Sequence, residues 1–468
     1  MSMLSNSVSG LLSMQRALST TSHNVANANT PGYSRQSVEI GARPPQFMGG
    51  QYIGSGTQVN GITRSFDQFV ENQLRDAGSD KGRDNFVADF TSQISQSLGD
   101  TEKGLSQDVQ AFFNATGDIA ANPTDLTARD ALLAQAEQLT NRFNRADRQL
   151  DSANSQLVNQ AMQTGDEINS IAREIAGLNQ KISLAPSGSS PNDLLDRRDK
   201  LVRDLSERID IRITEDDRGR MDIAVGVGFP LVLGEEAIEL VIGNTIADGI
   251  TASINGREFS SRIEGGRLGG IIQVEQDVVR PMREQLGEIA ITLAKEVNDI
   301  QSQGYDLNGA DGEPIFGFVG GLNLDTVDLS NIDSADAFGA AGQMRVVMTD
   351  PAKIAAAAEV EGTRDNSNIQ ALAELADKAQ GGLNNRTLSG ALNDFVSRAG
   401  TIASQARANA DISEATFDGL MARRESVSGV NLDEEAANLL AYQQNYLALS
   451  RTISVSDQLF QSILNAVR

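Results

Sequence analysis

The amino-acid sequence predicts a mainly α-helical chain with an inserted β-rich domain, elongated and nested so that its first and last helices pair as a coiled coil. Three observations predict this fold. Apolar residues recur every seven positions at both ends, a long apolar repeat runs through the middle, and strand-like alternation begins near residue 205. We therefore expect a terminal coiled coil, a long helical bundle and a distal domain of α+β or β type.

The first helix is expected over about residues 3–27. Its apolar row consists of Leu4, Leu11, Leu18 and Val25 at intervals of seven, and Val8 lies on the complementary row. Such spacing is typical of a coiled-coil seam. The other faces of this helix are polar but nearly uncharged, which suits packing against protein better than exposure to water.

The last helix repeats the pattern at the same interval. Its seam residues are Leu432, Leu439, Tyr442, Tyr446, Leu449, Ile453, Phe460, Ile463 and Val467. Isolated helices of this kind are marginal in water, because helical stability comes mostly from packing. We expect both terminal helices to be frayed or disordered in the monomer and to fold when the protein assembles. Two amphipathic helices packed on the core of their own domain remain the alternative.

The longest periodic segment covers about residues 127–183. Apolar positions alternate in steps of three and four up to Leu157 and resume at Ile168 after an extra step at Ala161, which is a stutter. At about 1.5 Å per residue such a helix would be on the order of 80 Å long. The sequence therefore predicts an elongated bundle.

The elements divide the chain into five segments. We expect an assembly core made of a coiled-coil helix, turn and short extended segments (1–62) and a C-terminal coiled-coil helix (428–468). The helical bundle is expected in two parts (63–204 and 351–427). An inserted, mostly β outer domain is expected between them (205–350), with a helix over 274–303 that can return to the bundle.

Charge supports this division. Roughly a tenth of the residues in 1–60 and 430–468 are charged, against roughly a quarter of those between, whereas a solvated surface normally carries charge throughout. This contrast predicts that protein covers the two ends and that the middle faces water.

Composition excludes several functional classes. The 468 residues include one histidine and no cysteine, which excludes disulfide scaffolds, thiol catalysis, thiolate metal sites and any site that needs two histidines. A formal net charge of −24 argues against non-specific binding to nucleic acid. No segment approaches the ~18 uncharged apolar residues of a membrane span, and the N-terminus lacks the pattern of a secretory signal. We expect no cofactor, no metal, no nucleic-acid partner and no membrane insertion.

Candidate chemical sites are weak. The segment 306–312 is similar to a calcium loop, but Ala310 and Asp311 stand where an EF-hand needs an oxygen ligand and a glycine, which favours a pair of turns. His23 suits packing or hydrogen bonding better than general-base chemistry. Acidic pairs in turns leave a carboxylate-pair hydrolase as an alternative that spacing alone does not exclude. We expect no catalytic residues and no enzyme.

The segment 22–33, Ser-His-Asn-Val-Ala-Asn-Ala-Asn-Thr-Pro-Gly-Tyr, resembles the N-terminal signature of bacterial flagellar rod, hook and hook-associated proteins. Its extension through Ser34 and Arg35 resembles the form in the hook-associated protein 1 family, which builds the first junction layer between hook and filament. The residues of this signature turn are Asn27, Asn29, Thr30, Pro31, Gly32, Tyr33, Ser34 and Arg35. Pro31 and Gly32 fit the two central positions of a type II turn. Further segments that resemble the family lie at 54–67, 192–199, 297–309 and 431–446.

The resemblance implies a structural component of the flagellum that connects hook to filament. It implies an extracellular protein, exported by the flagellar type III pathway without a cleaved signal peptide, which polymerises through its terminal helices. The implied partners are hook protein, hook-associated protein 3, an export chaperone that binds the C-terminal region, and other copies of the chain. Alternatives are another axial protein of hook or rod type, or an enzyme or adhesin displayed by the middle domain.

Overall fold

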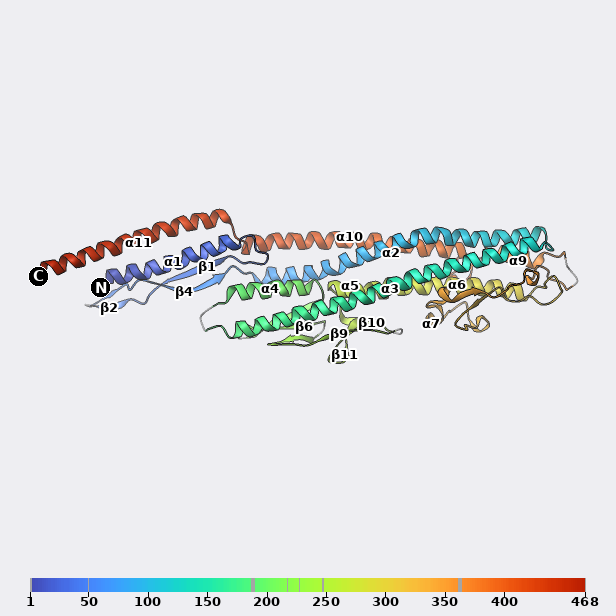
Figure 1. Ribbon diagram of the computed structural model, residues 1–468, viewed down its shortest axis with the longest axis horizontal. Coiled ribbons are helices and arrows are strands. Elements are labelled where there is room, and N and C mark those ends of the chain that lie inside the picture. The colour runs from blue at the N-terminus through green and yellow to red at the C-terminus, as the bar shows by residue number, and fades with distance from the viewer. Residues whose placement is uncertain are drawn as a thin grey trace.

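The computed structural model describes residues 2–48, 50–186, 190–216, 218–226, 228–245, 248–360 and 364–467. The molecule is a slender rod in which both termini lie at the same end (Figure 1). The expected fold is confirmed: the chain is mainly helical, its terminal helices pair with each other, and its sheets are small and antiparallel.

The end that carries both termini is here called the terminal unit. It consists of α1 (Ser2–Asn27), β1 (Gln36–Ala42), β2 (Gln46–Met48), β3 (Gln51–Ile53), β4 (Thr57–Arg64) and α11 (Leu432–Val467). Strand β1 pairs antiparallel with β4, and β2 with β3, so the strands form one long hairpin whose outer end is β2–β3. Helix α1 packs against α11 and also against β1 and β4.

The rest of the rod is the bundle. Its long helices are α2 (Gln68–Ala121), α3 (Leu126–Ser183) and α10 (Leu388–Ser428), joined by α4 (Asn192–Ser206), α5 (Gly266–Val274), a π-helical turn (Glu275–Val279), α6 (Arg280–Ser302) and α9 (Ser367–Glu374). Asp67 and Asp125 cap the first turns of α2 and α3 through their carboxylates. At 58 residues, α3 is about 87 Å long.

Helix α2 differs from its expectation. The sequence predicts helix from near Phe66 with breaks to about Gly117, whereas α2 is continuous from Gln68 to Ala121. Gly82 shows why a glycine stands in this helix: a Cβ there would lie 2.1 Å from the carbonyl oxygen of Glu207. The glycine permits close packing and does not break the helix.

The strands between α4 and α5 lie along the side of α3 (Figure 1). One sheet has the order β5 (Ile211–Glu215), β6 (Met221–Val225), β7 (Phe229–Leu233), β8 (Glu236–Ala237), and the other the order β11 (Arg257–Glu258), β10 (Gly249–Ile254), β9 (Leu240–Thr245). Two buried asparagines of α3 hold them. Asn179 bonds the backbone of Met221 and Gly234, and Asn169 bonds both backbone groups of Leu240.

The remaining elements lie at the far end of the bundle or in short connections. They are the strands β12 (Phe316–Phe318) and β13 (Met344–Val346), the short helices α7 (Ser334–Ala337) and α8 (Ala340–Gln343), and the 3₁₀ turns Ser260–Arg262, Leu324–Thr326, Pro351–Lys353 and Gly381–Leu383. The helix expected over 274–303 runs as α5, the π turn and α6 and is buried in the bundle. The division of the chain into domains at 205 and 350 stays a prediction.

A candidate assembly surface and its joint to the bundle

The terminal helices pack through small residues on α1 and large residues on α11. The buried residues of α1 are Ser7, Ser9, Gly10, Ser13, Ala17, Thr20, Thr21 and Asn24. Gly10 lies beneath Leu449, where a Cβ would meet that side chain's Cδ1 at 3.0 Å. The half-buried seam residues of α11 are Leu439, Tyr442, Tyr446, Leu449 and Ile453. The face of α1 that carries small residues therefore packs against the row of large residues on α11.

The other seam residues face away from this contact to different degrees. Leu11 and Leu18 are half-buried, whereas the exposed ones are Leu4, Val8, Val25, Leu432, Phe460 and Ile463. The side chain of Val467 lies outside the described residues. The role of all these residues in assembly stays a prediction, because it concerns neighbours of the chain.

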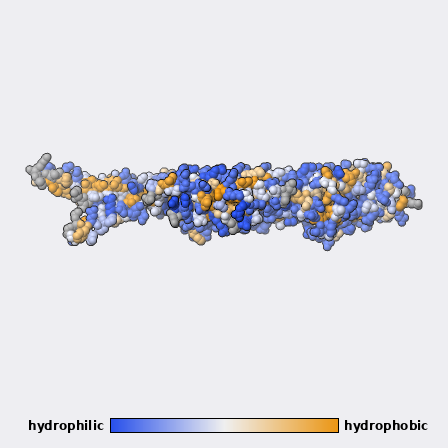
Figure 2. All heavy atoms as spheres, turned by 90° about the horizontal axis from the view of Figure 1, so that it is seen from below, coloured by the Kyte–Doolittle hydropathy of each residue, from blue (hydrophilic) through white to orange (hydrophobic). Residues whose placement is uncertain are grey.

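Further exposed hydrophobic residues were not foreseen. On α11 they are Leu440, Leu447, Val455 and Leu459, and on the long hairpin they are Ile40, Phe47, Tyr52 and Ile53. The interval of seven between Leu440 and Leu447 is a signal in the sequence that could have revealed a second row on α11. Figure 2 shows hydrophobic surface gathered along this narrow end of the rod.

The terminal unit has almost no hydrophobic core of its own. Among the residues that the structure describes, Ala17 is the single buried hydrophobic side chain of its helices and strands, whereas the bundle has a continuous core from α2 to α10. Exposed apolar patches of this extent on a soluble protein mark interaction surfaces. The terminal unit is therefore the candidate assembly surface.

The signature turn lies where the terminal unit meets the bundle. Tyr33 N–H donates to the carbonyl of Thr30 (3.1 Å), and Gly32 has a φ of +86°, so Pro31 and Gly32 form the type II turn that the sequence predicts. Asn27 bonds the hydroxyl of Thr30 and the carbonyl of His23. Asn29 lines a groove of about 1120 Å³ between this turn and the α10–α11 connection.

Asn24 is the centre of the polar contacts behind the turn. Its side chain exchanges two hydrogen bonds with the backbone of Gln36 (2.8 and 3.0 Å), accepts from the Tyr33 hydroxyl (2.7 Å) and donates to Glu435 Oε2 (3.0 Å). Burial raises the pKa of Tyr33 well above its usual range, and the nearby carboxylates, Asp193 first, raise it further. The phenol therefore stays protonated and keeps donating to Asn24.

Arg35 ties the turn to the start of α11. Its guanidinium pairs with Glu434 (2.6 Å) and with the buried Glu435 (2.7 Å). Its backbone N–H donates to the carbonyl of Ser428, the last residue of α10 (2.8 Å). Arg35 thereby fixes where α10 ends and α11 departs.

The segment 192–199 of α4 meets the same turn from the bundle side. Asp196 accepts from the backbone N–H of Ser34 (2.9 Å) and from Arg64 (3.0 Å), while Asp199 also pairs with Arg64. Asp193 accepts from Gln36 (2.9 Å) and lies 3.4 Å from His23 Nε2. Two segments that each resemble a family signature in the sequence are therefore partners in space.

A buried ionic cluster joins these contacts to the long helices. Glu71 of α2 pairs with Arg203 of α4 (2.8 Å) and with Arg424 of α10 (2.7 Å). Arg424 also donates to the carbonyl of Gly32 in the signature turn (3.2 Å). We call the contacts of the turn, Arg35, the 192–199 segment and this cluster the joint. These contacts are polar throughout. Their hydrogen-bond geometry therefore fixes the direction in which the terminal unit leaves the bundle.

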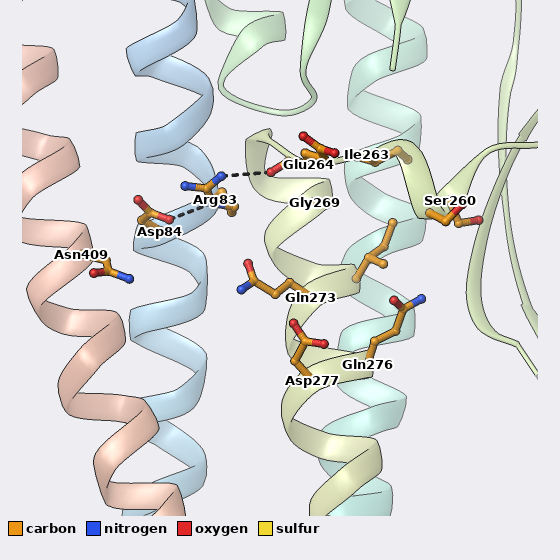
Figure 3. A pocket seen from close by; sticks show the side chains of 12 residues that line it. Arg83, Asp84, Ser260, Ile263, Glu264, Gly269, Gln273, Gln276, Asp277 and Asn409 are labelled. Carbon is orange, nitrogen blue, oxygen red and sulfur yellow. Dashed lines mark hydrogen bonds and ion pairs between the residues drawn. The ribbon is translucent and has the colours of Figure 1, made fainter. Parts of the chain in front are cut away.

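The hollow on the bundle surface that Figure 3 shows is lined by polar groups, some of which already bond each other. This hollow of about 380 Å³ opens between α2, α5 and α10 with polar walls, including Asp277 and Asn409 (Figure 3). Arg83 there donates to Asp84 (2.8 Å) and to the carbonyl of Glu264 (3.1 Å), so its charge is engaged.

The calcium-like loop has the structure of turns. Asp306 accepts hydrogen bonds from the N–H groups of Asn308 and Ala310. Within the described ranges, no group of three or more histidine or acidic side chains could hold a metal ion. No helix in the described part of the chain is long and apolar enough to cross a membrane.

Comparison with known proteins finds similar chains. A model of the "flagellar hook-associated protein FlgK helical domain" matches residues 91–316, and models of flagellar basal-body rod proteins match 4–33 and 424–466. Flagellar hook-associated protein 1 of Salmonella typhimurium is 28% identical over 99% of both chains, and that of Bacillus subtilis is 27% identical over 98% of this chain and 96% of its own. The chain is similar over its whole length to flagellar hook-associated protein 1.

The hook-associated protein 1 family is structural and non-enzymatic. A solved structure, the flagellar hook junction protein FlgK from Burkholderia pseudomallei, shares the fold with a TM-score of 0.67 at 18% identity, over 76% of this chain and all of that one. The resemblance seen in the sequence is confirmed. Both rod-protein matches fall mainly on the terminal unit, with the signature turn and the last residues of α10, so the axial-protein signature coincides with the candidate assembly surface.

Proposed function

We propose that this chain is a structural component of the bacterial flagellum that connects hook to filament, and that it assembles through its terminal unit. The observation that carries the proposal is the contrast between the two parts of the rod. The bundle buries a continuous core, whereas the terminal unit buries no large hydrophobic side chain fully among its described residues and leaves many of them exposed. Such a unit becomes stable when neighbouring subunits cover it.

The mechanism is folding coupled to association. In the monomer, α1 and α11 gain little from burial, because their contact joins small residues to a half-buried row. In the assembly, neighbouring subunits remove the exposed rows of both helices from water. This burial stabilises the assembly by about 25 cal/mol per Å² of apolar surface. Ordering and assembly therefore occur together, and subunits stay apart until they reach the growing structure.

Hook protein and hook-associated protein 3 are the proposed neighbours, and other copies of the chain are the lateral ones. An export chaperone is proposed to cover the C-terminal region before export by the type III pathway. The exposed row of α11 supports this, because Leu440, Leu447 and Phe460 would otherwise attract other chains in the cytoplasm.

The test replaces Leu440 and Leu447 by Asp, since both are exposed and neither supports the fold of the single chain. We expect normal helix content and loss of the chain from isolated flagella, measured with an antibody against the bundle. The matched control is Leu184→Asp with Leu233→Asp, two leucines of the bundle side that are 76% and 56% exposed, against 59% and 57% for Leu440 and Leu447. Normal incorporation of the α11 variant would contradict the mechanism.

The position in the flagellum is tested separately. A labelled antibody should mark the unmodified chain at the boundary between hook and filament. Labelling along the rod or the whole filament would contradict the junction role.

A further inference from the structure

The outer end of the long hairpin is an uncharged apolar tip. This hairpin tip, β2 with β3, exposes Phe47 and Tyr52, whose rings meet edge to face at 5.2 Å, together with Ile53. The sequence holds no charged residue between Arg43 and Arg64. Exposed aromatic pairs on a strand pair with no charged rim are typical of buried interface centres.

In the folded terminal unit the hairpin is hydrogen-bonded to α1, which gives its tip a defined place. Thr57 N–H donates to Ser9 Oγ (3.2 Å), and Asn6 donates to the carbonyl of Gly54 (3.2 Å). Gly56 has a φ of +94° and its backbone approaches Ser9 so closely that a Cβ would clash. The aromatic pair is therefore presented by a fixed element.

The last turns of α11 form a second uncovered apolar feature. Half-burial against α1 ends at Ser456, and beyond it the helix continues to Val467. Leu459, Phe460 and Ile463 are all more than half exposed there. Asp457 is the single charged residue between Arg451 and Arg468.

These two features lie at the same end of the rod but on different sides of α1 (Figure 1). Helix α1 packs against α11 with one side and against β1 and β4 with another, so α11 and the hairpin leave α1 on different sides. Two different apolar patches on different sides of one subunit make a heterologous contact, in which each copy gives one patch and receives the other. Such contacts close into rings or continue as helices.

We propose that the hairpin tip of one copy covers the last turns of α11 of the neighbouring copy, an inference that rests on the proposed function. We infer a second copy as the partner, because each chain carries both an uncharged aromatic patch, the hairpin tip, and an uncovered apolar patch, the last turns of α11. Within one chain these two patches lie apart. Each large aromatic side chain buries about 150–250 Å². One such contact is small and weak alone, and repetition around the assembly makes it effective.

The test uses the absence of cysteine from the sequence, which leaves no background for disulfide cross-linking. Cells express the full-length Tyr52→Cys/Phe460→Cys chain, and their isolated flagella are oxidised and run on a non-reducing gel. We expect a ladder in multiples of 49.9 kDa, which collapses to one band on reduction. Each single-cysteine variant should stay monomeric, and the two expressed together should give dimers only.

Three results would overturn the inference. The first is a double variant that enters flagella but stays monomeric on the gel. The second is a dimer from Tyr52→Cys alone, which would mean that two hairpin tips meet. The third is an equally strong ladder from the control Tyr52→Cys/Ile412→Cys. Ile412 is 66% exposed on α10, far from the terminal unit. Absence of the unmodified chain from flagella would instead contradict the proposed function, so the two failures are distinguishable. If the double variant does not enter flagella, the co-expressed single variants decide the question in the same way.

Discussion

Replacement of Glu71 by Gln should weaken the joint strongly. The Glu71 side chain is 5% exposed, and its two oxygens pair with Arg203 and Arg424 at 2.8 and 2.7 Å. A hydrogen bond to a charged group contributes about 1.5–3 kcal/mol, and breaking a buried ion pair by removing one partner costs about 3–5 kcal/mol. Gln keeps the shape but leaves two buried guanidinium groups facing each other without their shared anion.

The assay has two local readouts. We expect the free energy of unfolding of the segment around the joint to fall by about 3–5 kcal/mol, measured by native-state hydrogen exchange of α10 and α4. Limited proteolysis should cut faster near the signature turn, because Arg424 also holds the carbonyl of Gly32. The control is Arg197→Gln, whose ion pair with Glu174 is 3.4 Å long and mostly exposed, so its loss should cost under about 1 kcal/mol.

A loss in Glu71→Gln no larger than in the control would refute the reasoning. Replacing Glu71, Arg203 and Arg424 together by Met separates charge from packing. Well-packed apolar groups can substitute for a buried ion cluster at little cost, so the triple variant should be more stable than Glu71→Gln.

The remaining predictions concern the sheet, the turn and the terminal helices. Asn179→Ala should speed hydrogen exchange in β6, because three hydrogen bonds to the backbone of Met221 and Gly234 are lost. Each buried backbone group left without a partner costs about 1–3 kcal/mol. The control Gln180→Ala, at an exposed neighbouring position, should leave exchange in β6 unchanged. Because the fold keeps the Tyr33 proton that the unfolded chain releases near pH 10, stability should fall as pH rises above about 10, and Tyr33→Phe should flatten that fall in alkaline unfolding titrations. Backbone amides of α1 and α11 should exchange quickly in dilute monomer and slowly in flagella; strong protection in the monomer would contradict coupled folding.

The terminal helices show how far periodicity reaches. Repeats of seven located α1 and α11 and found the α11 residues that lie on α1, such as Tyr442 and Leu449. They did not show that α1 would meet them with Gly10 and small polar residues and leave Leu4 and Val8 exposed. Periodicity identifies an apolar row, but which row meets which neighbour depends on the shapes of both helices.

The joint shows the opposite case. The sequence located the signature turn and its type II geometry, because Pro31 and Gly32 restrict the backbone locally. It also indicated the segment 192–199 as a separate motif. That Asp196 bonds the turn, and that Glu71 collects arginines from two other helices, depends on contacts between residues far apart in the chain.

The sequence by itself determined the two terminal helices, the long helix α3, the charge-poor ends and the resemblance to the family, since these follow from local spacing, composition and short motifs. The tertiary structure alone decided that the sheets lie along α3 on two asparagines and that ion pairs orient the joint. It also decided which apolar residues of the terminal unit stay uncovered. The physical reason is that burial and ion pairing depend on two surfaces in contact, and local sequence patterns do not specify which surfaces will meet.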